Sequence, residues 1–209
     1  MISKKILAVI IIAFIAMIYL ILKLCMKNNK EMFQSMPNCP SSAGSMTIPP
    51  GIDAIADHNF NAARNTSCNN ITSVTIPNSV TRIGIYAFNS ATNLRSITFS
   101  QVSQLTTIGA YAFQGCTSLE SITLPNSVTI INNFAFSGCS ALESVTLGTR
   151  VENIGNQVFI NCNALTTFNI LRDSTSPTRI NKQGNSFMSM PLESQINQWF
   201  NTGDELTPP

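Results

Sequence analysis

The sequence contains few of the residues from which catalytic and metal sites are commonly built. Among 209 residues there is one histidine, His58, one tryptophan, and only 11% are charged. The sequence has no phosphate-binding glycine loop, no His-Glu-x-x-His metal motif and no Gly-x-Ser-x-Gly nucleophile motif. No partner nucleophile stands at a recognisable spacing from His58, which favours packing as a flat ring over a role as a base or pH switch. The sequence therefore predicts a protein that is not an enzyme, with no catalytic residue, metal site or cofactor.

Positive charge is also scarce beyond the first 30 residues. Residues 1–30 carry five lysines and no acid, whereas residues 31–209 carry seven lysines and arginines against ten acids. Binding to nucleic acid requires Lys and Arg clustered on one face, because the phosphate backbone supplies most of the affinity. The larger part of the chain is slightly acidic, so we expect no nucleic-acid partner.

One long hydrophobic run lies near the N-terminus. Residues 6–22 form an unbroken apolar stretch of 17 residues, ILAVIIIAFIAMIYLIL. As a helix this stretch spans about 25 Å, close to the ~30 Å of a bilayer core, and residues 24–26 extend it if Lys23 reaches the headgroups. We predict a single-pass transmembrane helix over residues 6–26 in contact with the lipid bilayer. A cleaved signal peptide is the alternative, although no small-residue cleavage motif follows the run.

The rest of the chain is built from repeats of 23 residues. The second copy has two extra residues, and an earlier divergent copy matches a later one at an offset of 28. The copies occupy residues 48–63, 71–93, 94–118, 119–141, 142–164 and a degenerate unit from Leu165 to near Phe187. Periods of 20–29 residues with regular aliphatic positions predict stacked solenoid coils. We therefore expect a mainly β solenoid of about six coils with short irregular or helical turns, behind one N-terminal transmembrane α-helix.

Hydrophobic residues recur at fixed positions of each copy and predict three columns in the core. Period-two alternation indicates one strand per coil with alternate side chains facing inward. The inward strand positions are Val74/Ile76, Ile97/Phe99, Ile122/Leu124, Val145/Leu147 and Phe168/Ile170. The second column is Ile83, Ile108, Ile131 and Ile154, and the third is Phe60, Phe88, Phe113, Phe136 and Phe159. Prolines 49, 77 and 125 stand where each strand should turn.

These repeats resemble a known family. The shared pattern is L-x-S-I-T-L-P-x-S-V-T-x-I-G-x-x-A-F-x-G-C, and it is similar to the BspA-like (Treponema-type) leucine-rich repeats over residues 48–187. The sequence departs from the pattern at Gly148-Thr149, which replace Pro-Asn, and in both terminal copies. The resemblance implies an adhesion-type, protein-binding module of a cell surface without catalytic activity.

The expected organisation follows from these segments. It comprises a polar tail at 1–5, the anchor at 6–26, a stalk and N-terminal cap at 27–45, the solenoid at 46–187 and a C-terminal cap at 188–209. Lysines are balanced on the two sides of the anchor, so the positive-inside rule selects neither orientation. Edge coils of a solenoid can pair with another strand, so a homo-oligomer is a further interpretation.

The cysteines fall into two groups. Three of them share one repeat position: Cys116, Cys139 and Cys162. The earlier copies place Ala63 and Ala91 there, which predicts a small buried slot and not a metal ligand, since no C-x-x-C spacing occurs. Three such thiols cannot all pair, which favours a reducing compartment. Cys39 and Cys68 could pair near the N-terminal cap, but their spacing leaves this open.

Two surface stripes are candidates for contact with a protein partner. The strand-face positions are Ser73, Thr75, Ser96, Thr98, Ser121, Thr123, Ser144 and Thr146, continued by Thr167 and Asn169. The aromatic positions are His58, Tyr86, Tyr111 and Phe134. Serine and threonine on a strand are also ordinary solvated filler, and without Trp or Arg anchors such a face binds weakly per contact.

Two glycosylation motifs bear on the side of the membrane that the solenoid occupies. Asn65 and Asn70 each begin an Asn-x-Ser/Thr sequence, which matters only in a secretory lumen. The sequence predicts a membrane-anchored, non-catalytic protein-binding module. The alternative is a structural protein that tethers a membrane to a protein shell, as in a large DNA-virus particle. The corresponding locations are a cell surface or a virion membrane.

Overall fold

The computed structural model describes residues 37–171 and 180–183. The predicted transmembrane helix at 6–26 and C-terminal cap at 188–209 lie outside these residues, as does the predicted tail at 1–5. Within the described ranges, no helix is both long enough and apolar enough to cross a membrane.

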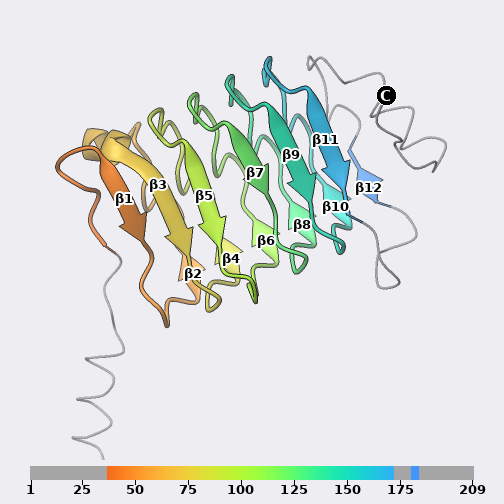
Figure 1. Ribbon diagram of the computed structural model, residues 1–209, viewed down its shortest axis with the longest axis horizontal. Coiled ribbons are helices and arrows are strands. Elements are labelled where there is room, and N and C mark those ends of the chain that lie inside the picture. The colour runs from red at the N-terminus through yellow and green to blue at the C-terminus, as the bar shows by residue number, and fades with distance from the viewer. Residues whose placement is uncertain (1–36, 172–179, 184–209) are drawn as a thin grey trace, which may run out of the picture. The chain divides into compact units, whose positions relative to one another are not determined.

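The described part of the chain is a succession of β coils with almost no helix, running from left to right in Figure 1. Each coil contributes one longer strand and one two-residue strand. The longer strands are β1 (Gly44–Thr47), β3 (Ile71–Ile76), β5 (Ser96–Phe99), β7 (Ser121–Thr123), β9 (Ser144–Leu147) and β11 (Thr167–Ile170). The short strands are β2 (Ala54–Ile55), β4 (Arg82–Ile83), β6 (Thr107–Ile108), β8 (Ile130–Ile131), β10 (Asn153–Ile154) and β12 (Asn181–Lys182). This architecture confirms the predicted mainly β solenoid of about six coils.

All strand pairs are parallel, and equivalent repeat positions lie side by side. The short strands form one six-stranded sheet, and Ile55 pairs with Ile83 at the predicted offset of 28. The longer strands form two separate sheets, β1-β3-β5 and β11-β9-β7, so that no ladder joins β5 to β7. In the first of these sheets Val74 pairs with Ile97, and in the second Ile122 pairs with Val145. Within residues 37–171 and 180–183, the one helical element is a 3-10 turn, η1 (Thr66–Asn70).

The phenylalanine column fills the centre of the solenoid as predicted. All five rings are fully buried. Successive rings stack with centroids 5.1, 5.2, 5.3 and 5.5 Å apart, from Phe60 through to Phe159. The backbone repeats the same step, since the N–H of Phe88 donates to Ala112 O at 2.7 Å in the next coil. Stacked rings and coil-to-coil hydrogen bonds together fix the repeat.

The isoleucine column is also buried as predicted, but the strand column is not uniform. Most of its members are at most 5% exposed, whereas Ile97, Phe99 and Ile170 are partly exposed. All three still pack against the core, so their predicted inward placement is confirmed, although part of each side chain is exposed. For Ile97 and Phe99 the cause is the missing ladder between β5 and β7, which leaves that side of β5 uncovered.

Glycine allows neighbouring coils to approach closely beside the short-strand sheet. A Cβ on Gly109 would lie 2.6 Å from the backbone of Gly84 in the preceding coil. Side-chain carbon atoms do not approach a backbone that closely, so this position accepts only glycine without a shift of the coils. Asn132 stands at the same position in the next coil, so the close glycine contact is a feature of the Gly84 and Gly109 coils and not of every repeat.

Candidate binding surfaces

The strand-face hydroxyls form one in-register array on the side of the longer strands. Ser73 pairs with Ser96 and Thr75 with Thr98, because β3 and β5 are parallel and equivalent positions align. The same alignment joins Ser121 to Ser144 and Thr123 to Thr146. Most of these side chains are exposed, while Ser73, Ser144 and Thr146 are half-buried. We call this array, with its additions below, the hydroxyl face.

The structure adds two hydroxyls that the sequence reasoning missed. Ser45 and Thr47 of β1 are exposed and lie beside Ser73 and Thr75. The segment Ser-Met-Thr repeats the Ser-Val-Thr spacing of the next coil, so the Ser-x-Thr pattern could have identified it. Thr167 and Asn169 continue the hydroxyl face on β11, and both are exposed.

The hydroxyls of the hydroxyl face are available for hydrogen bonds to a partner. Among the described residues, none of its serine and threonine side chains takes part in a hydrogen bond to the rest of the protein. Each hydroxyl can donate one hydrogen bond and accept others. The face carries no charged side chain, so it offers many neutral donors and acceptors at fixed spacing. Such a surface suits the polar backbone and side chains of another protein.

The aromatic stripe is a stack of rings and not a row of open faces. His58, Tyr86, Tyr111 and Phe134 lie in sequence with ring centroids 5.0, 4.6 and 4.9 Å apart and planes within 9° of parallel. Each ring therefore covers the face of its neighbour, and all four residues are half-buried. All four residues have φ between 56° and 59°, a left-handed conformation that bulky residues rarely adopt.

His58 stands at the end of this stack. Its Nδ1 lies 3.3 Å from Nδ2 of Asn61, and its ring packs flat against Tyr86. The neighbouring Asp57 has a lowered pKa, chiefly because the backbone N–H of Ile85 donates to its carboxylate at 2.9 Å. An ion pair with Arg82 at 3.2 Å lowers it further. The ring of His58 thus packs flat against Tyr86. The neighbouring Asp57 carboxylate is held by the backbone N–H of Ile85 and by Arg82.

The repeat cysteines occupy a buried slot, as predicted. The thiols of Cys116, Cys139 and Cys162 donate to the carbonyls of Phe88, Phe113 and Phe136, respectively, at 3.2–3.3 Å. Burial raises the pKa of Cys116 to about 12 and that of Cys139 well above its usual value. Ala91 shares the slot, but Ala63 is exposed, so the equivalence proposed for Ala63 was wrong. The first coil diverges there into the η1 turn.

Cys39 and Cys68 form a disulfide, with Cα atoms 4.7 Å apart. Cys68 is buried within η1, so the bridge fastens residue 39 to the first coils. Across the described ranges, His, Cys, Asp and Glu nowhere gather in a group of three or more that could hold a metal ion.

The two glycosylation motifs have different surroundings. Asn65 is exposed and caps η1, its side-chain oxygen accepting from the N–H of Ser67 at 3.1 Å. Asn70 is half-buried, and its Nδ2 donates to the carbonyl of Pro40 at 3.0 Å. Nδ2 is the atom to which a glycan would be joined, so only Asn65 has this atom free in the folded protein.

The stacked coils, with parallel strands on one side and leucines, isoleucines and phenylalanines in buried columns, define a leucine-rich-repeat solenoid. The chain belongs to the BspA-type leucine-rich-repeat family, whose repeat region matches residues 59–188 in six copies. The resemblance proposed from the sequence is thereby confirmed.

Solved bacterial structures share this fold. A leucine-rich cell surface protein from Faecalibacterium prausnitzii is 29% identical over 71% of this chain, with a TM-score of 0.58. A leucine-rich repeat protein from Bacteroides ovatus is 29% identical over 66%, with a TM-score of 0.52, and the chain covers 36% of it. The T. pallidum leucine-rich repeat protein is 23% identical over 80% of this chain and 88% of its own, with a TM-score of 0.51.

This chain spans 40% of the F. prausnitzii protein, well under its full length. No curated protein matches the sequence. Solenoids of the BspA type are typically non-catalytic scaffolds for protein interaction, and this chain has that scaffold.

Proposed function

We propose that the chain is a membrane-anchored, non-catalytic module of a cell surface that binds another protein through its hydroxyl face. The observation that carries the proposal is the array of free hydroxyls in register on two neighbouring sheets. A regular neutral face favours many weak hydrogen bonds over one strong contact. Binding of this kind gains strength from several modules acting together.

The comparisons support the location. The F. prausnitzii protein is described as a cell surface protein, and the apolar run at residues 6–22 supplies an anchor for such a module. The Cys39–Cys68 disulfide favours an oxidising environment. The three remaining thiols of the described part are buried, so they can stay reduced without a reducing compartment. The thiols therefore do not require a reducing compartment, contrary to the interpretation drawn from the sequence.

Topology separates the two functions. Intact cells or particles that carry the full chain are treated with a membrane-impermeant protease and, separately, with peptide-N-glycosidase. A surface module should lose the solenoid to protease from outside and keep the Cys39–Cys68 bridge without added oxidant. A solenoid protected from the protease, with cysteines 39 and 68 reduced, would refute the surface module and support the tether.

The binding face is tested by photo-crosslinking in the cells that make the protein. A photoreactive residue is placed at Thr75 or Thr146 on the hydroxyl face, and at Thr106 beside the short-strand sheet as the matched control. The proposal expects a discrete adduct from the first two positions and little from Thr106. Equal crosslinking from both sides would contradict a defined face.

A further inference from the structure

The row of longer strands is interrupted between β5 and β7. At the start of these strands the two coils are joined, since the N–H of Glu120 donates to Arg95 O at 3.3 Å. The side chains of Arg95 and Glu120 add an exposed ion pair at 3.5 Å. Farther along, no ladder connects the two strands. The strands are therefore tied at one end and separate toward the other.

Pro125 is one cause of this separation. At the equivalent position, the N–H of Ser100 donates to Ile76 O at 3.1 Å and the N–H of Leu171 donates to Leu147 O at 3.0 Å, each in the preceding coil. Proline has no N–H, so Pro125 cannot make the corresponding bond to Phe99. The ends of β5 and β7 therefore lack a link that two other junctions have. Pro77 stands at the same position in an earlier coil, where β1 and β3 remain paired, so the proline alone does not account for the separation.

A longer turn is the second cause. Leu105 takes the buried position that Val80 has in the previous coil, but the turn after Phe99 contains two more residues than the turn after Ile76. Val102, at the tip of the longer turn, is 71% exposed. The longer turn thus presents an apolar side chain to solvent.

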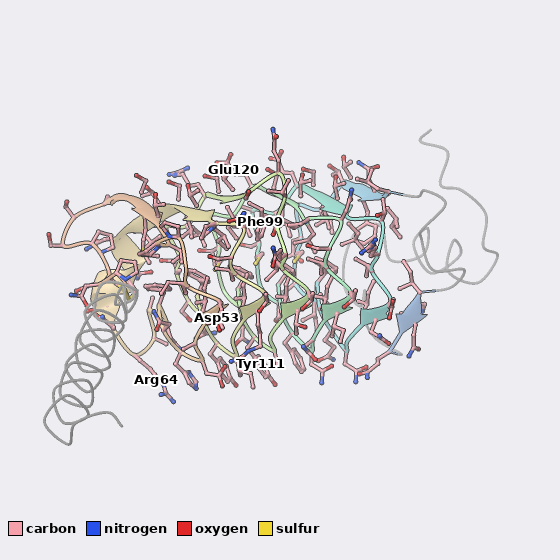
Figure 2. The ribbon with its side chains drawn as sticks, turned by 90° about the horizontal axis from the view of Figure 1, so that it is seen from below. Asp53, Arg64, Phe99, Tyr111 and Glu120 are labelled. Atoms are coloured by element: carbon pink, nitrogen blue, oxygen red, sulfur yellow. A yellow bond between two sulfur atoms is a disulfide. The ribbon has the colours of Figure 1, made fainter. Side chains whose placement is uncertain are left out.

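These changes open a groove of about 380 Å³ between the strand ends. Figure 2 shows Phe99 on the side of the longer strands, opposite Tyr111. Ten residues line the groove: Ile97, Thr98, Phe99, Ser100, Gln101, Thr123, Leu124, Pro125, Asn126 and Leu171. None of them is charged. We call this feature the β5–β7 groove.

The groove exposes apolar surface that the other coils cover. Ile97 and Phe99 are partly exposed, whereas their counterparts Val74 and Ile76 are at most 1% exposed. Leu171 is 43% exposed at the groove and Val102 lies next to its lining residue Gln101. Adjacent exposed apolar side chains of this kind mark a contact site more often than scattered ones do.

We propose that the β5–β7 groove is the anchor site of the hydroxyl face and receives an uncharged, aliphatic or aromatic side chain from a protein partner. The inference rests on the proposed function. A charged side chain would lose its hydration there without meeting an opposite charge, because the whole lining is neutral. An apolar side chain would instead cover Ile97 and Phe99.

Continuity with the hydroxyl face identifies the occupant as part of a protein docked on that face. Thr98 and Thr123 belong to both the hydroxyl face and the groove. A partner segment that follows the hydroxyls across the strands therefore passes over the groove midway. Interfaces gain most of their affinity from a few side chains buried in central pockets, and the β5–β7 groove offers such a pocket within the hydroxyl face.

The test uses a phage-displayed library of random twelve-residue peptides, selected on the full chain in lipid nanodiscs. Bound peptides should share a large apolar residue with uncharged neighbours. Thr98→Arg, which places a charge at the groove, should weaken them by about tenfold or more. The matched comparison is Thr75→Arg, at the same ladder position one coil away on the hydroxyl face, with a smaller expected loss of about threefold.

A second pair of variants fills the groove without adding charge. Thr123→Phe should compete for the groove and weaken the peptides more than Thr146→Phe, its ladder partner on the hydroxyl face. Circular dichroism melting of each variant verifies that the solenoid is intact.

The outcomes separate the two proposals. If the groove and control variants weaken the peptides equally, the face binds but the groove is no anchor, and this inference fails alone. If no variant matters, or no peptide is selected, the groove inference fails and the proposed binding face loses its support as well.

Discussion

The ring of Tyr111 lies 4.6 Å from the ring of Tyr86 with the two planes 5° apart, although the backbone of Tyr111 has a φ of 58°. A left-handed conformation costs an ordinary residue roughly 1–2 kcal/mol. Two interactions offset this cost: the N–H of Tyr111 donates to Asn133 O at 3.0 Å in the next coil, and its ring is stacked on both sides. The aromatic column therefore compensates a strained backbone as well as contributing to the surface.

Replacing Tyr111 should reveal both the stabilisation by ring stacking and the cost of the left-handed backbone. Tyr111→Ala removes two ring stacks, each worth about 0.5–1.5 kcal/mol, and keeps the backbone strain. We expect it to lower the free energy of unfolding by about 1–3 kcal/mol. Tyr111→Gly loses the same stacks but relieves the strain, so it should be less destabilising than Tyr111→Ala. Tyr111→Phe should be nearly neutral in urea unfolding of the full chain. If glycine were worse than alanine here, the strain argument would be wrong.

The close contact of Gly109 with Gly84 predicts a strong effect of one added methyl group. The Cβ of Gly109→Ala would lie 2.6 Å from the backbone of Gly84 and force the coils apart. Overpacking of this kind costs about 1–3 kcal/mol, measured as a lower midpoint of chemical unfolding. Gly44→Ala is the control, because its Cβ would meet nothing closer than 3.8 Å. Similar losses in the two variants would contradict the close-approach explanation.

The buried thiols predict a reactivity pattern. The pKa of Cys116 is raised from 9.0 to about 12 by burial, so its thiolate population at pH 8 is roughly a thousandfold smaller than in the unfolded chain. Maleimide should label cysteines 116, 139 and 162 only after denaturation. Fast labelling of the native protein, seen by mass spectrometry, would show that the slot is open.

The same pKa shift has a consequence for stability. A thiol with a raised pKa in the folded state holds its proton longer there than in the unfolded chain. The contribution of Cys116 to stability is therefore complete below pH 9 and decreases as the pH rises from 9 to about 12. Cys116→Ala introduces the residue that Ala91 supplies at the same repeat position in the preceding coil. This variant should show a smaller decrease in the free energy of unfolding between pH 9 and about 12.

Glycosylation should distinguish the two asparagine motifs. In a secretory host we expect one glycan, at Asn65, because Nδ2 of Asn70 is bonded to Pro40 O at 3.0 Å. Ser67→Ala should abolish the mobility shift that peptide-N-glycosidase produces, and Thr72→Ala should leave it unchanged. The opposite pattern would mean that glycans are added before residue 40 packs against the first coils.

The sequence was sufficient for the features that repeat. The columns of Phe, Ile and Cys follow from a 23-residue period, because each coil must place the same residues against its neighbours. The two extra residues of the second copy and Pro125 were visible as well. Their joint effect was not, since opening a ladder depends on which strand ends face each other in space.

Other features needed coordinates for similar reasons. Periodicity put His58, Tyr86 and Tyr111 in one column but did not give the left-handed backbone that turns their rings face to face. Ser45 and Thr47 were missed because the first coil is divergent outside its Ser-x-Thr pattern. The pairing of Cys39 with Cys68 depended on the fold of η1, which spacing does not provide.

The most direct test of the account is the affinity of the photo-crosslinked partner for surface variants of the full chain. Thr75→Arg combined with Thr146→Arg alters the hydroxyl face, and Thr106→Arg alters the opposite side. We predict that the first combination weakens binding by about tenfold or more while Thr106→Arg changes it less than about threefold. A partner that binds the double variant as tightly as the unaltered chain, but is lost with Thr106→Arg, would contradict the assignment of the hydroxyl face as the binding surface.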